Sequence, residues 1–281
     1  MMNSKTPAMP ACGATNLSKD CYCLELIFNS CPKRPCKDCP IRDLGNRGMK
    51  LDRALKQVKK FTEQAKAKGF KGLEVHLIGG DSLKDWTHFV DFCNGVWKFQ
   101  REQLYPIQIM ATTCGFCLDE GKETFLLENS WRLQLIFRWN GEAGRRVWNN
   151  FSVLKYHPMT REVDYCVIKS DLKNFNADVK EIAALNKRIA FEFPNPATYF
   201  ELLKIAEKQG SKDYLFVSEA YGDCTERLCT VDIHGDIYSC RYFSPERLTF
   251  SSLKDTDKEF DKARKANAAC PVAPYFSSKI N

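Results

Sequence analysis

Apolar positions between residues 21 and 210 alternate between two spacings, which predicts strands and helices in turn. Over residues 50–68 the apolar side chains recur every three or four positions, and Gly69 follows where a helix C-cap is expected. The next run, Gly72–Ile78, is short, apolar and closed by Gly79 and Gly80, which is typical of a buried strand. The same pattern predicts strands at Cys23–Asn29, Pro106–Thr112, Arg132–Arg138, Glu162–Lys169 and Arg188–Phe193, and helices at Asp85–Glu102, Glu120–Asn129, Ala177–Asn186 and Thr198–Gln209.

About six strand–helix units follow one another over some 190 residues. Strands joined through helices are expected to be parallel, with right-handed crossovers. Six units are too few for a closed barrel of eight strands, so the sequence predicts an α/β fold with a partial (β/α)6 barrel of parallel strands. In such folds the chemistry lies at the carboxyl ends of the strands, which is where Gly79 and Gly80 stand.

Beyond Gly210 the pattern changes to shorter elements, which predicts a separate extension. Two short strands, Leu228–Val231 and Ile237–Cys240, flank a turn at Gly235, and a last helix is expected at Lys254–Ala269. We therefore expect a flexible leader over residues 1–20, a partial barrel over residues 21–210 and a small cysteine-rich C-terminal extension over residues 211–281.

The chain has 281 residues and a formal net charge of +7, with both signs of charge mixed along it. No apolar run reaches eighteen residues, and the polar segment Met1–Cys12 lacks the apolar core of a secretory signal, so we expect a cytoplasmic protein without a membrane span. The basic excesses at Lys56–Lys71 and Lys254–Lys265 are interleaved with acidic residues, as on solvated helix faces. Binding to nucleic acid is therefore only weakly supported.

Fourteen cysteines are the unusual feature of the composition. In a reducing compartment, clustered thiols bind metal more often than they form disulfides, and both zinc and iron–sulfur clusters favour thiolate ligands. The densest group, Cys31-Pro-Lys-Arg-Pro-Cys36-Lys-Asp-Cys39, places three thiols within nine residues. Three thiolates suit a cubane cluster with one open iron, whereas a structural zinc site needs a fourth ligand, for which Cys21 or Cys23 is available. Spacing alone leaves both metals open.

The position of this three-cysteine loop favours iron–sulfur over zinc. The loop follows the first predicted strand, and the second strand ends in Gly79-Gly80-Asp81-Ser82. This order of motifs resembles the radical S-adenosylmethionine (SAM) superfamily. The resemblance implies that the loop holds a [4Fe-4S] cluster through Cys31, Cys36 and Cys39, and that its open iron binds SAM. It also implies that the amino group of SAM is bound by Gly79, Gly80 and Asp81.

The chain departs from the family pattern in both motifs. Asp81 stands where glutamate is usual, which keeps the charge on a shorter arm, and Ser82 replaces proline. The cysteines are separated by four and then two residues, whereas three and then two is usual, and Asp38 replaces the usual aromatic residue. A set of ligands that begins at Cys21 or Cys23 fits less well, because that segment is needed as the first strand.

The C-terminal cysteines resemble the SPASM and twitch extensions of the same superfamily. Cys224, a glycine turn at Gly235 and Cys240 follow the order in which those extensions bind an auxiliary cluster. Cys229 and Cys270 complete four ligands for one auxiliary [4Fe-4S] cluster of twitch type. A zinc-stabilised hairpin is the alternative.

The resemblance implies a radical SAM enzyme, of iron–sulfur oxidoreductase or maturase type. Such an enzyme cleaves SAM reductively to a 5′-deoxyadenosyl radical, which abstracts hydrogen from a substrate, with electrons from a reductant such as flavodoxin or ferredoxin. A peptide or protein is the first expectation for the substrate, and a nucleotide or nucleic acid the second. A non-catalytic zinc- or cluster-binding protein remains the alternative from another class.

The remaining candidates are assigned to structure. His76 alternates with apolar neighbours and is expected to be a core histidine. Cys114 and Cys117 follow the third strand and are expected in a turn, whereas Cys93 and Cys166 are expected to be core thiols.

Overall fold

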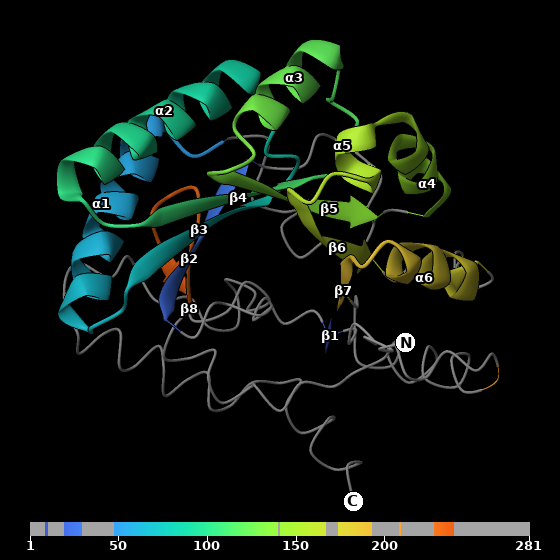
Figure 1. Ribbon diagram of the computed structural model, residues 1–281. Coiled ribbons are helices and arrows are strands. Elements are labelled where there is room, and N and C mark those ends of the chain that lie inside the picture. The colour runs from blue at the N-terminus through green and yellow to red at the C-terminus, as the bar shows by residue number, and fades with distance from the viewer. Residues whose placement is uncertain are drawn as a thin grey trace, which may run out of the picture.

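The computed structural model describes residues 9–10, 20–29, 48–139, 141–166, 174–192, 208 and 228–238. Nine strands in this part of the chain form one sheet, in the order β1-β7-β6-β5-β4-β3-β2-β8-β9 (Figure 1). Its central strands are parallel and comprise β2 Cys21–Asn29, β3 Gly72–Gly79, β4 Ile107–Thr113, β5 Leu133–Trp139, β6 Thr160–Cys166 and β7 Arg188–Glu192. Within the described residues the sheet ends at β1 and β9 and does not close, which confirms the predicted partial barrel.

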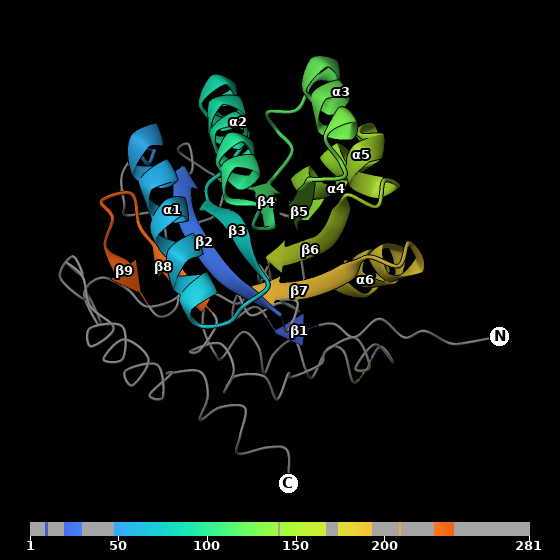
Figure 2. The same cartoon turned by 60° about the vertical axis from the view of Figure 1, so that its left-hand side comes forward.

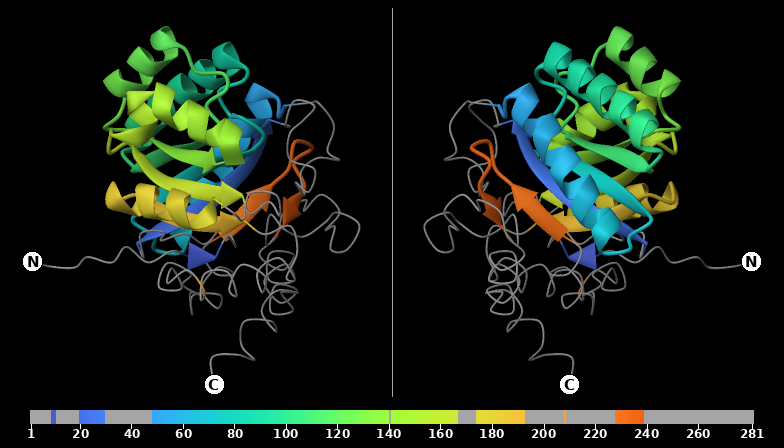
Figure 3. Two further views of the ribbon diagram at one scale, coloured as in Figure 1. Left: turned by 90° about the vertical axis from the view of Figure 1, so that its right-hand side faces the viewer. Right: turned by 90° about the vertical axis from the view of Figure 1, so that its left-hand side faces the viewer.

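Helices connect the central strands and lie along one face of the curved sheet (Figures 2 and 3). They comprise α1 Leu51–Ala67, α2 Trp86–Gln103, α3 Glu120–Glu128, α4 Gly141–Asn150, α5 Ser152–Lys155 and α6 Phe175–Ala184. Aspartates cap two of them, because the side chain of Asp85 accepts from His88 N before α2 and that of Asp119 accepts from Lys122 N before α3.

The two faces of the sheet have different chemistry. On β3, Leu73, Val75 and Leu77 belong to the hydrophobic core beneath the helices. Glu74 and His76 alternate with them and therefore lie on the opposite, inner face of the partial barrel. The same alternation places Glu25, in register with His76, on the inner face of β2. The partial barrel thus has an apolar outer face and a polar inner face.

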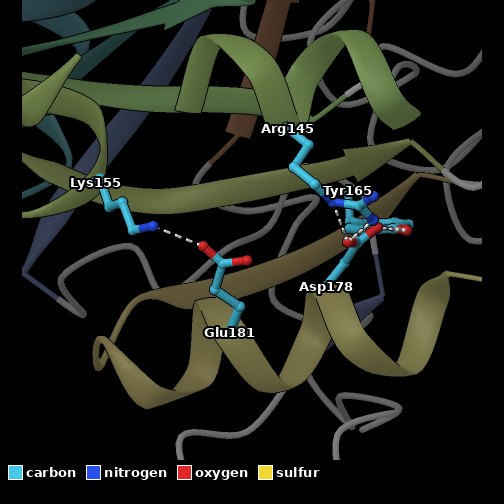
Figure 4. Close-up of polar contacts among 5 residues, drawn as sticks. All are labelled: Arg145, Lys155, Tyr165, Asp178 and Glu181. Carbon is cyan, nitrogen blue, oxygen red and sulfur yellow. Dashed lines mark hydrogen bonds and ion pairs between the residues drawn. The ribbon is translucent and has the colours of Figure 1, made fainter. Parts of the chain in front are cut away.

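A polar network holds α6 against its neighbours (Figure 4). The Asp178 carboxylate, 1% exposed, accepts hydrogen bonds from the Arg145 guanidinium of α4 and from the Tyr165 hydroxyl of β6, the latter at 2.8 Å. One turn later on α6, Glu181 pairs with Lys155 of α5 at 2.8 Å. The carboxylate partner raises the pKa of Arg145.

Short strands extend the sheet at both edges. β8 Leu228–Val231 pairs in parallel with β2 and antiparallel with β9 Ile237–Tyr238, and β1 Met9–Pro10 pairs in parallel with β7. The hairpin expected in the C-terminal extension therefore continues the barrel sheet. The expected helix Lys254–Ala269 lies outside the described residues, as does Thr198–Gln209 apart from Lys208, and the boundary near residue 211 stays a prediction.

None of the helices in the described ranges is both long and apolar enough to cross a membrane.

Candidate cofactor site at the carboxyl edge of the sheet

Asn29, the last residue of β2, joins the ends of the first two central strands. Its carbonyl accepts from Gly80 N at 2.5 Å, and its Nδ2 donates to the carbonyls of Asp81 at 3.4 Å and Ser82 at 3.5 Å. Since Cys31 follows Asn29 by only two residues, the chain enters the three-cysteine segment beside the Gly79–Ser82 turn. The sequence analysis did not single out Asn29, because its partners lie about fifty residues away along the chain.

Gly79 is required by the close approach of β2 to this turn. Its φ is +108°, and a Cβ at this position would overlap the carbonyl oxygen of Asn29. Other residues rarely adopt such a φ. The backbone contact that demands glycine here is therefore within the protein.

Asp81 is buried and is held by three hydrogen bonds from uncharged groups. Its Oδ1 accepts from Leu83 N at 3.0 Å and from the Thr113 hydroxyl at 2.8 Å, and its Oδ2 accepts from the Cys114 thiol at 3.0 Å. Asp81 is 3% exposed. Thr113 is the last residue of β4, so the carboxylate bridges the carboxyl ends of two adjacent strands.

The surroundings of Asp81 suit a cationic ligand. It forms no ion pair with any residue that the structure describes, and a buried carboxylate without a positive partner is costly. A carboxylate has about four acceptor positions, so three donors leave one, and it belongs to Oδ2. The residues present therefore fit an ammonium group.

Arg138 brings a buried positive charge to the same turn. Its Nη1 donates to the Gly79 carbonyl at 3.3 Å, and its Nη2 lies 3.8 Å from Asp164 Oδ2 on the next strand. The Arg138 and Asp164 side chains are 6% and 4% exposed. The Gly79–Ser82 turn thus combines a guanidinium at one end with a carboxylate at the other, an arrangement that suits a zwitterion.

The inner face below this turn carries further buried polar side chains. Glu25 is fully buried and its Oε2 accepts from the Thr230 hydroxyl at 2.7 Å. His76 is also fully buried, and its Nε2 lies 3.5 Å from Glu74 Oε2. Neither ring nitrogen of His76 makes a hydrogen bond to a residue that the structure describes. The expected core histidine is therefore buried, but on the polar side of the sheet.

The alternation of polar residues in successive strands was the sequence signal for this inner face. Parallel strands that are buried on both faces usually form continuous apolar runs. Here a polar residue recurs at every second position in Gly72–Gly79, and polar positions also lie in register on the neighbouring strands. The sequence analysis assigned these residues to strands without asking which face they share.

The predicted ligands of the SAM-binding cluster, Cys31, Cys36 and Cys39, lie outside the described residues. Cys21 and Cys23, the alternative fourth zinc ligands, lie at the amino end of β2. At about 3.3 Å per residue, Cys21 is roughly 26 Å from the end of this strand at Asn29. Within the described ranges no three His, Cys, Asp or Glu side chains are grouped as a metal site would require.

The predicted auxiliary ligands divide in the same way. Cys224, Cys240 and Cys270 lie outside the described residues. Cys229 lies in β8 beside Leu24, is 1% exposed and belongs to the hydrophobic core. Burial raises the pKa of the Cys229 thiol well above its usual range, which disfavours the thiolate that a metal ligand supplies. This position favours packing over ligation.

The other described thiols occupy the places expected for them. Cys93 is fully buried in α2, where desolvation raises its pKa. Cys114 and Cys117 lie in the turn between β4 and α3, and both are partly exposed. Burial and the nearby Asp81 carboxylate raise the pKa of both. What the sequence analysis missed is that Cys114 contacts Asp81.

Solved structures with a similar fold hold ligands. The crystal structure of anSMEcpe with bound AdoMet, which is SAM, matches with a TM-score of 0.60 and 15% sequence identity, over 88% of this chain and 82% of that chain. Native anSMEcpe with bound AdoMet and Kp18Cys peptide gives the same values. Streptococcus suis SuiB bound to precursor peptide SuiA matches with a TM-score of 0.55 and 10% identity, over 86% of this chain and 66% of that chain.

At these identities the likeness shows a shared fold. No protein-family model and no curated protein sequence matches the chain.

Proposed function

We propose that this protein is a radical SAM enzyme that modifies a peptide or protein. The observation that carries the proposal is the buried Asp81 carboxylate, which has three uncharged donors and one open acceptor position beside the strand end that leads into the cysteine loop. A fold shared with a structure that binds AdoMet supports the choice of ligand.

SAM is a zwitterion at its methionine end, and the Gly79–Ser82 turn suits it. In the proposal, Asp81 Oδ2 binds the ammonium group, and the Arg138 guanidinium beside Gly79 offsets the charge of the carboxylate group. Asn29 keeps the turn next to the cysteine segment, so one ligand reaches both.

Cys31, Cys36 and Cys39 would hold the [4Fe-4S] cluster, with Cys224, Cys240 and Cys270 as candidate ligands of an auxiliary site. When bound, the cluster and SAM supply one-electron cleavage of SAM and abstraction of a hydrogen atom from the substrate. The protein residues bind and orient the ligands and exclude water. The buried inner face, with Glu25, Glu74 and His76, is the proposed lining for the substrate.

A peptide or protein is the substrate class that the similar structures favour, because anSMEcpe and SuiB were each solved with a peptide bound. A nucleotide or nucleic acid is the second candidate, since the net charge of +7 suits an anionic substrate.

The first experiment is anaerobic purification and reconstitution, with iron, sulfide and zinc counted, followed by addition of dithionite and SAM. We expect a brown protein that forms 5′-deoxyadenosine, and loss of this product in Cys36→Ala. Cys93→Ala is the matched control, because Cys93 is a buried core thiol in α2. Stoichiometric zinc, no colour and no cleavage of SAM would establish the alternative, a zinc-stabilised α/β protein.

A second experiment identifies the substrate class. The reconstituted enzyme is incubated with SAM, dithionite and either deuterated whole-cell protein or a deuterated ribonucleotide pool. Abstraction from the true substrate places deuterium in 5′-deoxyadenosine, which mass spectrometry detects. Deuterium from the protein pool supports the proposal, and deuterium from the ribonucleotide pool alone overturns the peptide assignment.

A further inference from the structure

The Asp81 carboxylate is oriented by two side chains from the end of β4. Thr113 donates to Oδ1 at 2.8 Å, and Cys114 donates to Oδ2 at 3.0 Å. The first contact is fully buried, because Thr113 is 0% exposed. Thr113 is itself held, since Gly115 N donates to its hydroxyl oxygen at 2.9 Å and leaves the hydroxyl hydrogen for Asp81.

Each contact constrains a different oxygen of the carboxylate. Oδ1 receives two donors, Leu83 N and the Thr113 hydroxyl, so its acceptor positions are filled. Oδ2 receives only the Cys114 thiol among the residues that the structure describes. Rotation of the carboxylate would break hydrogen bonds at both oxygens, so the open acceptor position of Oδ2 has a fixed direction.

The Cys114 thiol is suited to act as a donor and poorly suited to act as a nucleophile or metal ligand. Desolvation, together with the charge of the Asp81 carboxylate and the hydrogen bond to it, raises the pKa of Cys114, so the sulfur keeps its proton at neutral pH. Cys117, three residues later, makes no such bond, although its pKa is also raised.

We infer that Thr113 and Cys114 are positioning residues, which aim Asp81 Oδ2 at the ammonium group of SAM. The inference rests on the proposed function, because it assigns two further residues to the same site. Of the two cysteines in the turn, it gives a role to Cys114 and none to Cys117.

The test measures ligand binding to the anaerobically reconstituted holoprotein, without turnover. The dissociation constant is determined for SAM and for 5′-methylthioadenosine, which contains the adenosine portion of SAM but lacks its amino-acid portion. Thr113→Val and Cys114→Ala each remove one donor, Cys114→Ser retains one, and Cys117→Ala is the matched control from the same turn. Circular dichroism and iron content establish that each variant folds and carries its cluster.

Thr113→Val and Cys114→Ala are each expected to weaken SAM binding roughly tenfold, the usual effect of losing a hydrogen bond to a charged group. Binding of 5′-methylthioadenosine should stay within about twofold, because it has no ammonium group, whereas a general loss of structure would weaken both ligands. Cys114→Ser should recover most of the SAM affinity, and Cys117→Ala should match the wild type.

Equal SAM affinity in the wild type and Cys114→Ala would overturn the inference for Cys114, and a parallel loss of both ligands would reduce its role to structure. If Thr113→Val does not fold, the comparison of Cys114→Ala with Cys114→Ser decides alone. A wild-type holoprotein that binds no SAM would instead overturn the proposed function, so the two failures are distinguishable.

Discussion

At the scale of single residues, Gly79 is constrained by its neighbour across the sheet. The positive φ and the overlap that a Cβ would make with the Asn29 carbonyl are separate obstacles to any other residue. Gly69 offers a comparison, because it has a φ of +79° but no atom within 4 Å of an added Cβ. The pair separates the cost of backbone conformation from the cost of steric overlap.

We predict that Gly79→Ala lowers the free energy of unfolding by about 3 kcal/mol or more, whereas Gly69→Ala lowers it by about 1 kcal/mol. Both alanines adopt an unfavourable φ, but only Ala at position 79 must displace β2. Urea unfolding followed by circular dichroism measures the difference. Similar losses in the two variants would show that the strand ends separate easily, contrary to the contact described.

Residue roles at this site were only partly accessible from the sequence. Gly79 and Asp81 were found because they follow a predicted strand, and their position relative to the cysteine loop matched a known motif. The partners Asn29, Thr113 and Arg138 were not found, because each depends on the register of strands that are distant in sequence. The reason for glycine at position 79 also differs from the expected close approach of a ligand.

At the scale of elements, the packing of α6 depends on a buried carboxylate. Asp178 bridges α4 and β6, whereas Glu181, on the same helix, forms a pair whose side chains are 19% and 35% exposed (Figure 4). Ion pairs near water contribute little, but removal of a buried partner leaves polar groups unpaired.

We predict that Asp178→Asn lowers the free energy of unfolding by about 2 kcal/mol, and that Glu181→Gln lowers it by less than about 1 kcal/mol. Both substitutions keep the shape of the side chain and remove one charge from α6. Parallel urea titrations measure the two losses. If Glu181→Gln proved the more costly of the two, the role assigned to the buried network would be wrong.

Lys187 makes the end of α6 and the start of β7 sensitive to pH. Its Nζ donates to the carbonyls of His157 at 2.5 Å and Thr160 at 2.9 Å, and burial lowers its pKa from 10.5 to about 8. Between these two values the unfolded chain binds a proton that the folded protein has released. The free energy of unfolding contributed by this residue therefore rises as the pH increases from about 8 towards 10.5.

We predict that the wild type gains about 1–3 kcal/mol relative to Lys187→Met between pH 7.5 and pH 10. The difference between the two proteins removes the contributions of other groups that titrate in this range. Chemical unfolding at several pH values provides the measurement. A constant difference across the range would mean that the Lys187 ammonium stays as accessible to water as in the unfolded chain.

Most elements were predictable from the sequence, with bounds within about two residues at many of their ends, because their periodicities were strong. The pair α4 and α5 was not, and the reason is tertiary. Gly141 and Gly144 lower the intrinsic helix propensity of α4. The helix is stabilised instead by Trp148, which stacks on Phe137 at 5.4 Å, and a Cβ at Gly144 would lie only 3.3 Å from the Trp139 backbone.

At the scale of the whole molecule, the sheet separates stability from chemistry. Its outer face builds the hydrophobic core beneath the helices, and its inner face collects buried ionisable groups from strands β2, β3, β5 and β6. Burying such groups lowers stability unless they have partners. A fold that retains them on one side is organised around a polar ligand, and the open edge order leaves the six central strands curved around that side.

A ligand bound only by the folded state must therefore stabilise the whole protein. With SAM at about 100 times its dissociation constant, linkage adds about 2.7 kcal/mol to the free energy of unfolding. For a chain of this size we predict a rise in melting temperature of roughly 5–10 °C in the reconstituted holoprotein. Asp81→Asn should show a much smaller rise, because the amide keeps the size of the side chain but no longer offsets a positive charge. The shift is measured at one scan rate, with cluster-free protein as a control, since the proposed site needs both the turn and the cysteine loop. An equal rise in Asp81→Asn would remove Asp81 from the site, and no rise in the wild-type holoprotein would contradict SAM as the ligand.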